Sequence, residues 1–155
     1  MEKELIEQAY AYCQKICKNA SSTFFTSFSA LEHQKSHAVH AVYALCRWVD
    51  DIVDGDDEPN VLETDELLQQ SIARDLILRD IHSERSIAST PEVHMQRLMA
   101  LVSIRNDLKR ASEGLITTED QNIFIALQDV FSRYPIRLQD FETVIEGMED
   151  DLFTV

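Results

Sequence analysis

The sequence contains few residues that interrupt regular structure, with three glycines and three prolines among 155 residues. This scarcity disfavours turn-rich β folds and, with 45% hydrophobic residues, predicts a single all-α domain over residues 1–155. The three cysteines are odd in number and form no Cys-x-x-Cys pair, which disfavours a disulfide framework or a thiolate zinc site. We therefore expect Cys13, Cys17 and Cys46 to be reduced and to have no chemical role.

Cations and long apolar runs are also scarce. The 14 basic residues face 28 acidic ones, a formal charge of −14, so we expect no nucleic-acid partner. No apolar run approaches the roughly 20 residues of a membrane span, and the N-terminus lacks the order of a secretory signal. These absences predict a cytoplasmic protein. A phosphorylated substrate remains compatible with the charge, because Mg²⁺ bridges carboxylates and phosphates.

Apolar residues recur at spacings of three and four through most of the chain, the pattern of amphipathic helices. The expected helices cover about residues 3–18, 32–54, 64–82, 91–110, 119–134 and 138–152. A short helix with three phenylalanines, capped by Ser21, Ser22 or Thr23, is expected between the first two. Residues 83–90 are expected to form a polar connector.

The helix expected at 32–54 carries a narrow polar stripe in an apolar surface. Tyr43, Arg47, Asp50 and Asp54 lie at i, i+4, i+7 and i+11, so they project from one face. The flanking positions are apolar, and we expect the stripe to line an internal cavity. Buried carboxylates need neutralising cations, and oxygen ligands favour Mg²⁺, with Mn²⁺ as an alternative, at Asp50 and Asp54. Arg47 is placed to contact a phosphate oxygen.

Other interpretations of this helix remain open. An Asp-Asp-x-x-Asp sequence in an arbitrary helix is more often surface charge than a metal site. His33, His37 and His40 lie at i, i+4 and i+7, a spacing that also suits a zinc ion. Solvated or internally satisfied histidines explain this spacing equally well.

Two groups of residues resemble the squalene/phytoene synthase family, with the nearest likeness to bacterial dehydrosqualene (diapophytoene) synthases. The stronger group is Ser21-Ser22-Thr23-Phe24 followed by AVYALCRWVDDIVD at residues 41–54, and the weaker is VIEGMEDDL at 144–152. The resemblance implies an all-α isoprenoid synthase fold. It also implies a central cavity with an aspartate-rich motif on each of two facing helices and Mg²⁺ ions between them.

The resemblance also assigns roles to residues by position. Asp50 and Asp54 would ligate Mg²⁺, and Arg47 and Tyr43 would face the diphosphate of the substrate. Arg47, Asp50 and Asp54 are thus the expected catalytic residues. The other expected substrate-binding residues are Asp51 and, in a flap that closes over the site, Ser21 and Phe24.

The implied reaction is the head-to-head condensation of two prenyl diphosphates, most simply farnesyl diphosphate, to a dehydrosqualene- or phytoene-type carotenoid precursor. One alternative is a relative that hydrolyses farnesyl diphosphate to the alcohol. Another is a helical interaction module without catalytic activity. Peripheral association with a membrane is a further expectation, because the product would be apolar.

Two departures from the family qualify these expectations. The segment at about 59–96 is longer than its counterpart and has no functional explanation in the sequence. Family members run to nearly twice this length, and no second carboxylate cluster is found here, although Asp150 and Asp151 come nearest. We therefore expect an N-terminal half that is inactive by itself. Its uncovered apolar faces predict self-association or a partner that supplies the C-terminal half.

Overall fold

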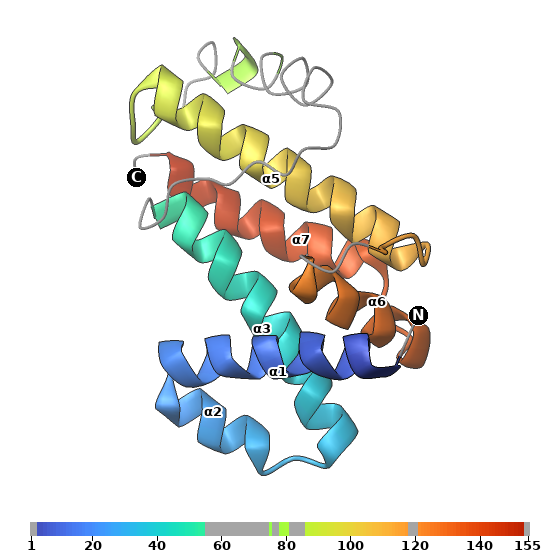
Figure 1. Cartoon of the computed structure of the whole chain (residues 1–155). Coiled ribbons are helices and arrows are strands. Elements are labelled where there is room, and N and C mark those ends of the chain that lie inside the picture. The colour runs from blue at the N-terminus through green and yellow to red at the C-terminus, as the bar shows by residue number, and fades with distance from the viewer. Residues whose placement is uncertain (1–2, 55–74, 76–77, 81–85, 118–120, 154–155) are drawn as a thin grey trace. The chain divides into compact units, whose positions relative to one another are not determined.

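A computed structural model describes residues 3–54, 75, 78–80, 86–117 and 121–153 (Figure 1). Its elements are α1 (Lys3–Ala20), α2 (Ser22–Ser29), α3 (His33–Asp54), α5 (Pro91–Ser112), α6 (Asn122–Arg133), α7 (Leu138–Glu149) and the 3₁₀ helix η1 (Asp150–Leu152). Among the described residues the only extended pairing is an isolated antiparallel bridge between Ile87 and Phe153. The predicted all-α class is confirmed.

The predicted helices agree closely with the observed ones. Ser21 is the N-cap of α2, and its hydroxyl accepts a hydrogen bond from the backbone N–H of Phe24 at 3.2 Å. The helix expected at 138–152 tightens into η1 for its last turn. Most of the helix expected at 64–82 lies outside the described residues. No helix within the described ranges is long and apolar enough to cross a membrane.

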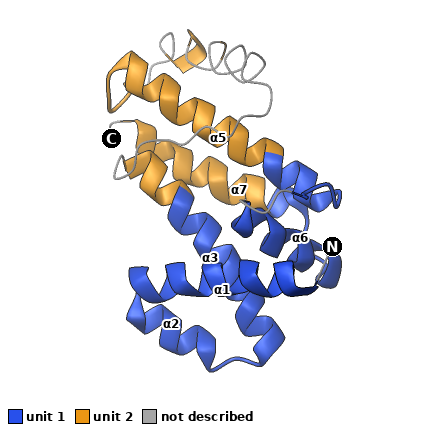
Figure 2. Ribbon diagram, in the orientation of Figure 1, with its two compact units in different colours: residues 1–48, 107–140 blue, residues 49–106, 141–155 orange. Residues whose placement is uncertain are grey.

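The chain divides into two compact units (Figure 2). Unit 1 comprises residues 1–48 and 107–140, and unit 2 comprises residues 49–106 and 141–155. The helices α3 and α5 each contribute to both units. The predicted single domain over 1–155 stays a prediction.

Unit 1 is built around α6, which packs against α1. Five consecutive α6 residues are buried, from Ile123 to Leu127, so this helix is enclosed on all sides rather than amphipathic at its start. The facing side of α1 buries Ala9, Cys13 and Cys17. Both cysteines are free thiols, and burial raises the pKa of Cys13 to about 12. They act as small apolar residues, as the sequence predicts.

A side chain of α6 also completes the hydrogen bonding of the loop after α5. The N–H of the fully buried Ile116 donates to Gln128 Oε1 at 2.7 Å, and Gln128 Nε2 donates to the Ile116 carbonyl at 3.1 Å. Buried backbone polar groups need such partners, because an unsatisfied one costs about 1 to 3 kcal/mol. Gln128 therefore replaces the backbone partner that a helix or strand would provide.

Unit 2 has its own apolar core and a buried polar pair. The core includes Val49, Ile52, Leu98, Leu101, Ile104, Phe141, Ile145 and Leu152. His94 on α5 is fully buried, and its Nε2 lies 2.9 Å from a carboxylate oxygen of Asp80, which is also buried. The ring of Phe153 packs edge-on against His94 with centroids 5.4 Å apart. This pair thereby links residues before α5 to the end of α7.

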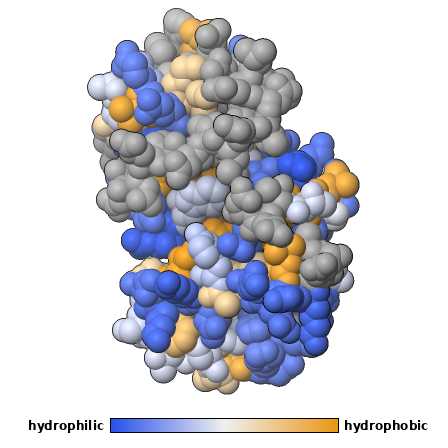
Figure 3. Space-filling view, in the orientation of Figure 1, coloured by the Kyte–Doolittle hydropathy of each residue, from blue (hydrophilic) through white to orange (hydrophobic). Residues whose placement is uncertain are grey.

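The described residues on the face drawn in Figure 3 are mainly hydrophilic. On this face, hydrophobic residues form small scattered patches between hydrophilic ones. The large exposed hydrophobic residues come from several elements and include Tyr12, Phe24, Leu31, Leu78, Leu115 and Val144.

The Gln128 bridge gives a first prediction. Gln128→Ala should lower the free energy of unfolding by about 2 kcal/mol, because both polar groups of buried Ile116 lose their partner. Gln128→Glu should also destabilise the chain, because it keeps an acceptor for the Ile116 N–H but places a carboxylate oxygen against the Ile116 carbonyl. Urea denaturation measures both, with the exposed α1 residue Gln8 changed to alanine as the control. Equal midpoints for Gln128→Ala and Gln8→Ala would contradict the assignment.

The buried pair of unit 2 gives a second prediction. Asp80→Ala should destabilise the chain by about 2 kcal/mol, because His94 keeps a buried ring nitrogen without its partner. Arg79 also contacts Asp80, at 2.9 Å, but its side chain is 62% exposed. Arg79→Ala should therefore cost no more than about 1 kcal/mol. Thermal denaturation distinguishes the two variants, and a larger loss for Arg79→Ala would show that the surface contact dominates.

Candidate metal centre

The acidic end of the predicted stripe lies in unit 2, where a third carboxylate joins it. Asp50 and Asp54 project from α3, and Asp151 projects from η1. One oxygen from each of the three carboxylates lies within 4.8 Å of the others. Asp50 is half-buried, whereas Asp54 and Asp151 are exposed. The arrangement brings three hard oxygen donors to one point on the surface of unit 2.

The donor set suits a hard divalent cation. Mg²⁺ binds oxygen at about 2.1 Å in an octahedron, so opposite ligands lie about 4.2 Å apart. Small side-chain rotations would bring the three observed oxygens within that span. Two of the carboxylates face solvent, which leaves coordination positions for water or for phosphate oxygens. The residues present therefore fit Mg²⁺ or Mn²⁺ better than zinc, which favours nitrogen and sulfur donors.

Asp151 is the site residue that the sequence analysis missed. Asp150 and Asp151 have no acidic residue four positions later, so they lack the spacing of an aspartate-rich motif along a single helix. The structure instead pairs Asp151 with α3, which is distant in sequence. The weaker family resemblance over 144–152 was the one signal in the sequence that pointed to this turn.

The turn that carries Asp151 is anchored by its neighbours. Leu152 is fully buried, and its carbonyl accepts a hydrogen bond from the Ala88 N–H at 2.8 Å. The bridge between Ile87 and Phe153, together with the Phe153–His94 contact, holds the next residue. Asp151 is thus exposed but attached to a buried support, which limits how far its carboxylate can move from α3.

The basic and aromatic part of the stripe belongs to unit 1. Tyr43 and Arg47 are half-buried. The rings of Phe24 and Phe28, stacked 5.7 Å apart on α2, both meet Tyr43 edge-on at about 6 Å. Phe24 is 51% exposed, so this aromatic cluster reaches the surface. Phe24, which the family resemblance assigns to a flap, thus contacts Tyr43 of the stripe, and its role in a flap stays a prediction.

Other predicted site residues have more limited roles in the structure. The Ser21 hydroxyl is engaged in capping α2, and Asp51 is half-buried on α3. Asp54 is exposed, and the other residues of the stripe are half-buried. The internal cavity expected along the stripe stays a prediction.

The three histidines of α3 do not converge on one site. His40 is fully buried between Phe25 and Phe28, with ring centroids at 5.6 and 6.0 Å. Burial and the neighbouring His37 lower the pKa of His40, so its ring is neutral at pH 7. The rings of His33 and His37 instead contact each other at an angle of 55° and line a pocket with α1 and α6. The zinc interpretation that used all three histidines is therefore wrong, because α2 covers the third.

Comparisons with known proteins identify the family. A squalene/phytoene synthase family model matches residues 17–154. The chain is 26% identical over 149 residues to phytoene synthase 2, chloroplastic, of Solanum lycopersicum, covering 96% of this chain and 36% of that protein. It is 26% identical over 147 residues to 15-cis-phytoene synthase of Synechococcus elongatus, covering 95% and 35%. A shorter match of 49 residues, 32% of this chain, is 43% identical to 4,4'-diapophytoene synthase of Staphylococcus haemolyticus and covers 17% of it.

The matches to the two phytoene synthases cover most of this chain but only part of each relative. The chain spans about a third of the length of the two phytoene synthases that it matches almost throughout. No solved structure matches it significantly. The family match includes α3 and the turn η1, which together supply the three aspartates. With an all-α fold and a match over most of its residues, this chain belongs to the squalene/phytoene synthase family.

Proposed function

We propose that this chain forms one wall of the active site of an enzyme that joins two prenyl diphosphates head to head. The family is one of prenyltransferase-type enzymes, and the relatives include phytoene and diapophytoene synthases. The observation that carries the proposal is the convergence of Asp50, Asp54 and Asp151 at the end of a helix that also carries Arg47. A surface of this kind suits a diphosphate bound through divalent metal.

Three carboxylates define the metal-binding part of the proposed site. Asp50 and Asp54 would hold Mg²⁺, or Mn²⁺ in its place, and Asp151 would add a third oxygen from the opposite element. When bound, the metal supplies positive charge that stabilises the departing diphosphate. The anchored position of η1 limits the reorganisation that Asp151 needs in order to contribute.

Arg47 and Tyr43 would recognise the substrate's phosphate groups. The Arg47 guanidinium is a permanent cation whose fork of N–H groups matches phosphate oxygens. The hydroxyl of Tyr43 offers a neutral donor on the same face of α3. Together they would orient the diphosphate and balance the charge that develops as the C–O bond to the allylic carbon breaks.

The aromatic cluster of α2 and α3 would cover the prenyl chain. Phe24, Phe28 and Tyr43 present ring faces and edges that exclude water and favour a nearby positive charge. Water exclusion matters because water would quench an allylic cation to the alcohol. A second prenyl double bond attacks the cation in the condensation, and water takes its place in the hydrolytic alternative.

The remaining parts of the proposal concern the whole protein. Because the chain spans about a third of its relatives, we propose that a further segment or partner supplies the opposite wall and that this chain alone turns over little substrate. Self-association is the simplest substitute for such a partner. The expected apolar product would favour peripheral contact with a membrane.

Metal-dependent binding provides the test. Isothermal titration with a non-hydrolysable farnesyl diphosphate analogue should show binding with Mg²⁺ and at least ten-fold weaker binding without it. Asp50→Ala, Asp54→Ala and Asp151→Asn should each weaken binding by ten-fold or more, about 1.4 kcal/mol. Asp150→Asn is the matched control, because it removes the same charge from the same turn without touching the cluster.

The outcomes separate the alternatives. Affinity that is indifferent to Mg²⁺ and to Asp50→Ala would refute the metal-site proposal and favour a non-catalytic helical module. If Asp151→Asn binds the analogue as tightly as Asp150→Asn does, then Asp151 is not a metal ligand and the site consists of the α3 aspartates alone. For a protein that includes the opposite wall, the product distinguishes the two reactions, since condensation yields a hydrocarbon and hydrolysis yields farnesol.

A further inference from the structure

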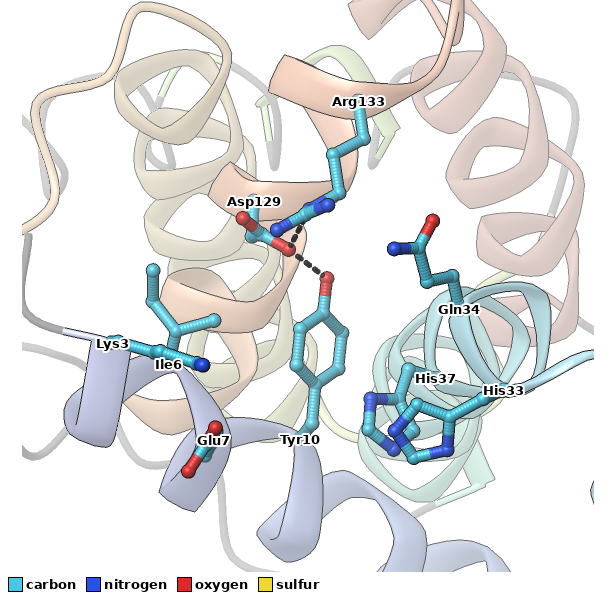
Figure 4. A pocket seen from close by; sticks show the side chains of 9 residues that line it. All are labelled: Lys3, Ile6, Glu7, Tyr10, His33, Gln34, His37, Asp129 and Arg133. Atoms are coloured by element: carbon cyan, nitrogen blue, oxygen red, sulfur yellow. Dashed lines mark hydrogen bonds and ion pairs between the residues drawn. The ribbon is translucent and has the colours of Figure 1, made fainter.

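Unit 1 contains a pocket that the proposed reaction does not use. It has a volume of about 530 Å³ and lies between α1, α3 and α6 (Figure 4). Histidines from the start of α3 form one wall, and charged residues from α1 and α6 form the others. Figure 4 shows the rings of His33 and His37 beside that of Tyr10, which extends toward Asp129.

The two histidines are already close together. His33 and His37 lie one turn apart on α3, and their ring centroids are separated by 4.1 Å. An i, i+4 pair of imidazoles on one helical face is a geometry in which both rings reach one metal ion. His33 is exposed and His37 half-buried, so the pair opens from the pocket toward solvent.

A chain of contacts fixes the orientation of His37. Its ring stacks on Tyr10 with centroids 4.9 Å apart and planes 26° apart. The Tyr10 hydroxyl donates a hydrogen bond of 2.6 Å to an Asp129 carboxylate oxygen. Arg133 Nε donates to the same oxygen at 2.8 Å. Tyr10, held in place by Asp129, thus restricts the orientation of the His37 ring by stacking on it.

The charges around the pair do not oppose a cation. Lys3 and Arg133 are balanced by Glu7 and Asp129, so the lining has no net formal charge apart from the histidines. Burial and His33 lower the pKa of His37, while the carboxylates of Asp129 and Glu7 act in the opposite direction. A neutral imidazole with its lone pair available is the form that binds metal.

We infer that His33 and His37 form a binding site for a divalent transition-metal ion of the zinc class. Imidazole nitrogen suits Zn²⁺, Co²⁺, Ni²⁺ and Cu²⁺ and discriminates against Mg²⁺, which prefers oxygen. Water would complete the coordination of such an ion, because no third histidine, cysteine or carboxylate of the described residues converges with the two imidazoles.

This inference is independent of the proposed function, because the aspartates of the candidate metal centre take no part in it. The test uses tag-free protein and buffer with excess Mg²⁺, so that the carboxylate site is presented with its preferred ion. Titration with ZnCl₂ should reveal one site of micromolar affinity. Titration with CoCl₂ should give visible absorption bands typical of nitrogen ligation. Zinc should also raise the melting temperature by several degrees, because it binds the folded state.

Variants assign the ligands. His33→Gln and His37→Gln should each weaken zinc binding at least ten-fold and abolish the zinc-dependent rise in melting temperature. Gln34→Ala, between them in sequence, and Asp54→Ala, at the other candidate site, should bind zinc as the wild type does. Glu7→Gln, which changes another residue of the pocket lining, should also bind zinc as the wild type does.

Three results would overturn the inference. The first is zinc affinity that is unchanged in both His33→Gln and His37→Gln. The second is zinc binding that is lost in Asp54→Ala, which would place the ion at the carboxylates. The third is binding of inorganic diphosphate at this pocket, lost in Arg133→Gln, with no binding of zinc.

Discussion

The repulsion among Asp50, Asp54 and Asp151 is the interaction on which the candidate metal centre depends. Two like charges about 4 Å apart repel by roughly 1 kcal/mol in water and roughly 4 kcal/mol at an effective dielectric constant of 20. Two of the three carboxylates are exposed, so their repulsion lies toward the lower value, whereas half-buried Asp50 feels more of it. A divalent ion bound among the three carboxylates would convert the same proximity into attraction.

The support for Asp151 explains how the folded chain opposes that repulsion. The turn is followed by buried Leu152 and by Phe153, which packs on His94. His94 in turn is held by Asp80, within the segment that is longer here than the family resemblance implies. The described part of this segment therefore acquires a structural role that sequence comparison did not suggest.

Local features of the fold were predictable from sequence, and long-range ones were not. Helical periodicity, the Ser21 cap and the α3 stripe depend on residues within a few positions of one another, so their spacing reveals them. The partners of these features are set by packing between distant elements. Asp151 reaches α3 from the end of α7, and His40 is covered by phenylalanines of α2 that leave only His33 and His37 facing the pocket. The spacing of residues along one helix cannot reveal these contacts between distant elements.

Donor chemistry, rather than charge, is what would keep two metal sites on one acidic chain distinct. A formal charge of −14 attracts any divalent cation toward the surface and does not choose among them. The carboxylate cluster of unit 2 offers oxygen ligands, and the imidazole pair of unit 1 offers nitrogen ligands. Mg²⁺ gives up its water reluctantly and gains little from imidazole, whereas zinc-class ions bind nitrogen strongly. The sites differ also in support, since Asp151 depends on a buried turn and His37 on a stacked tyrosine. Loss of either support would therefore affect one ion and spare the other.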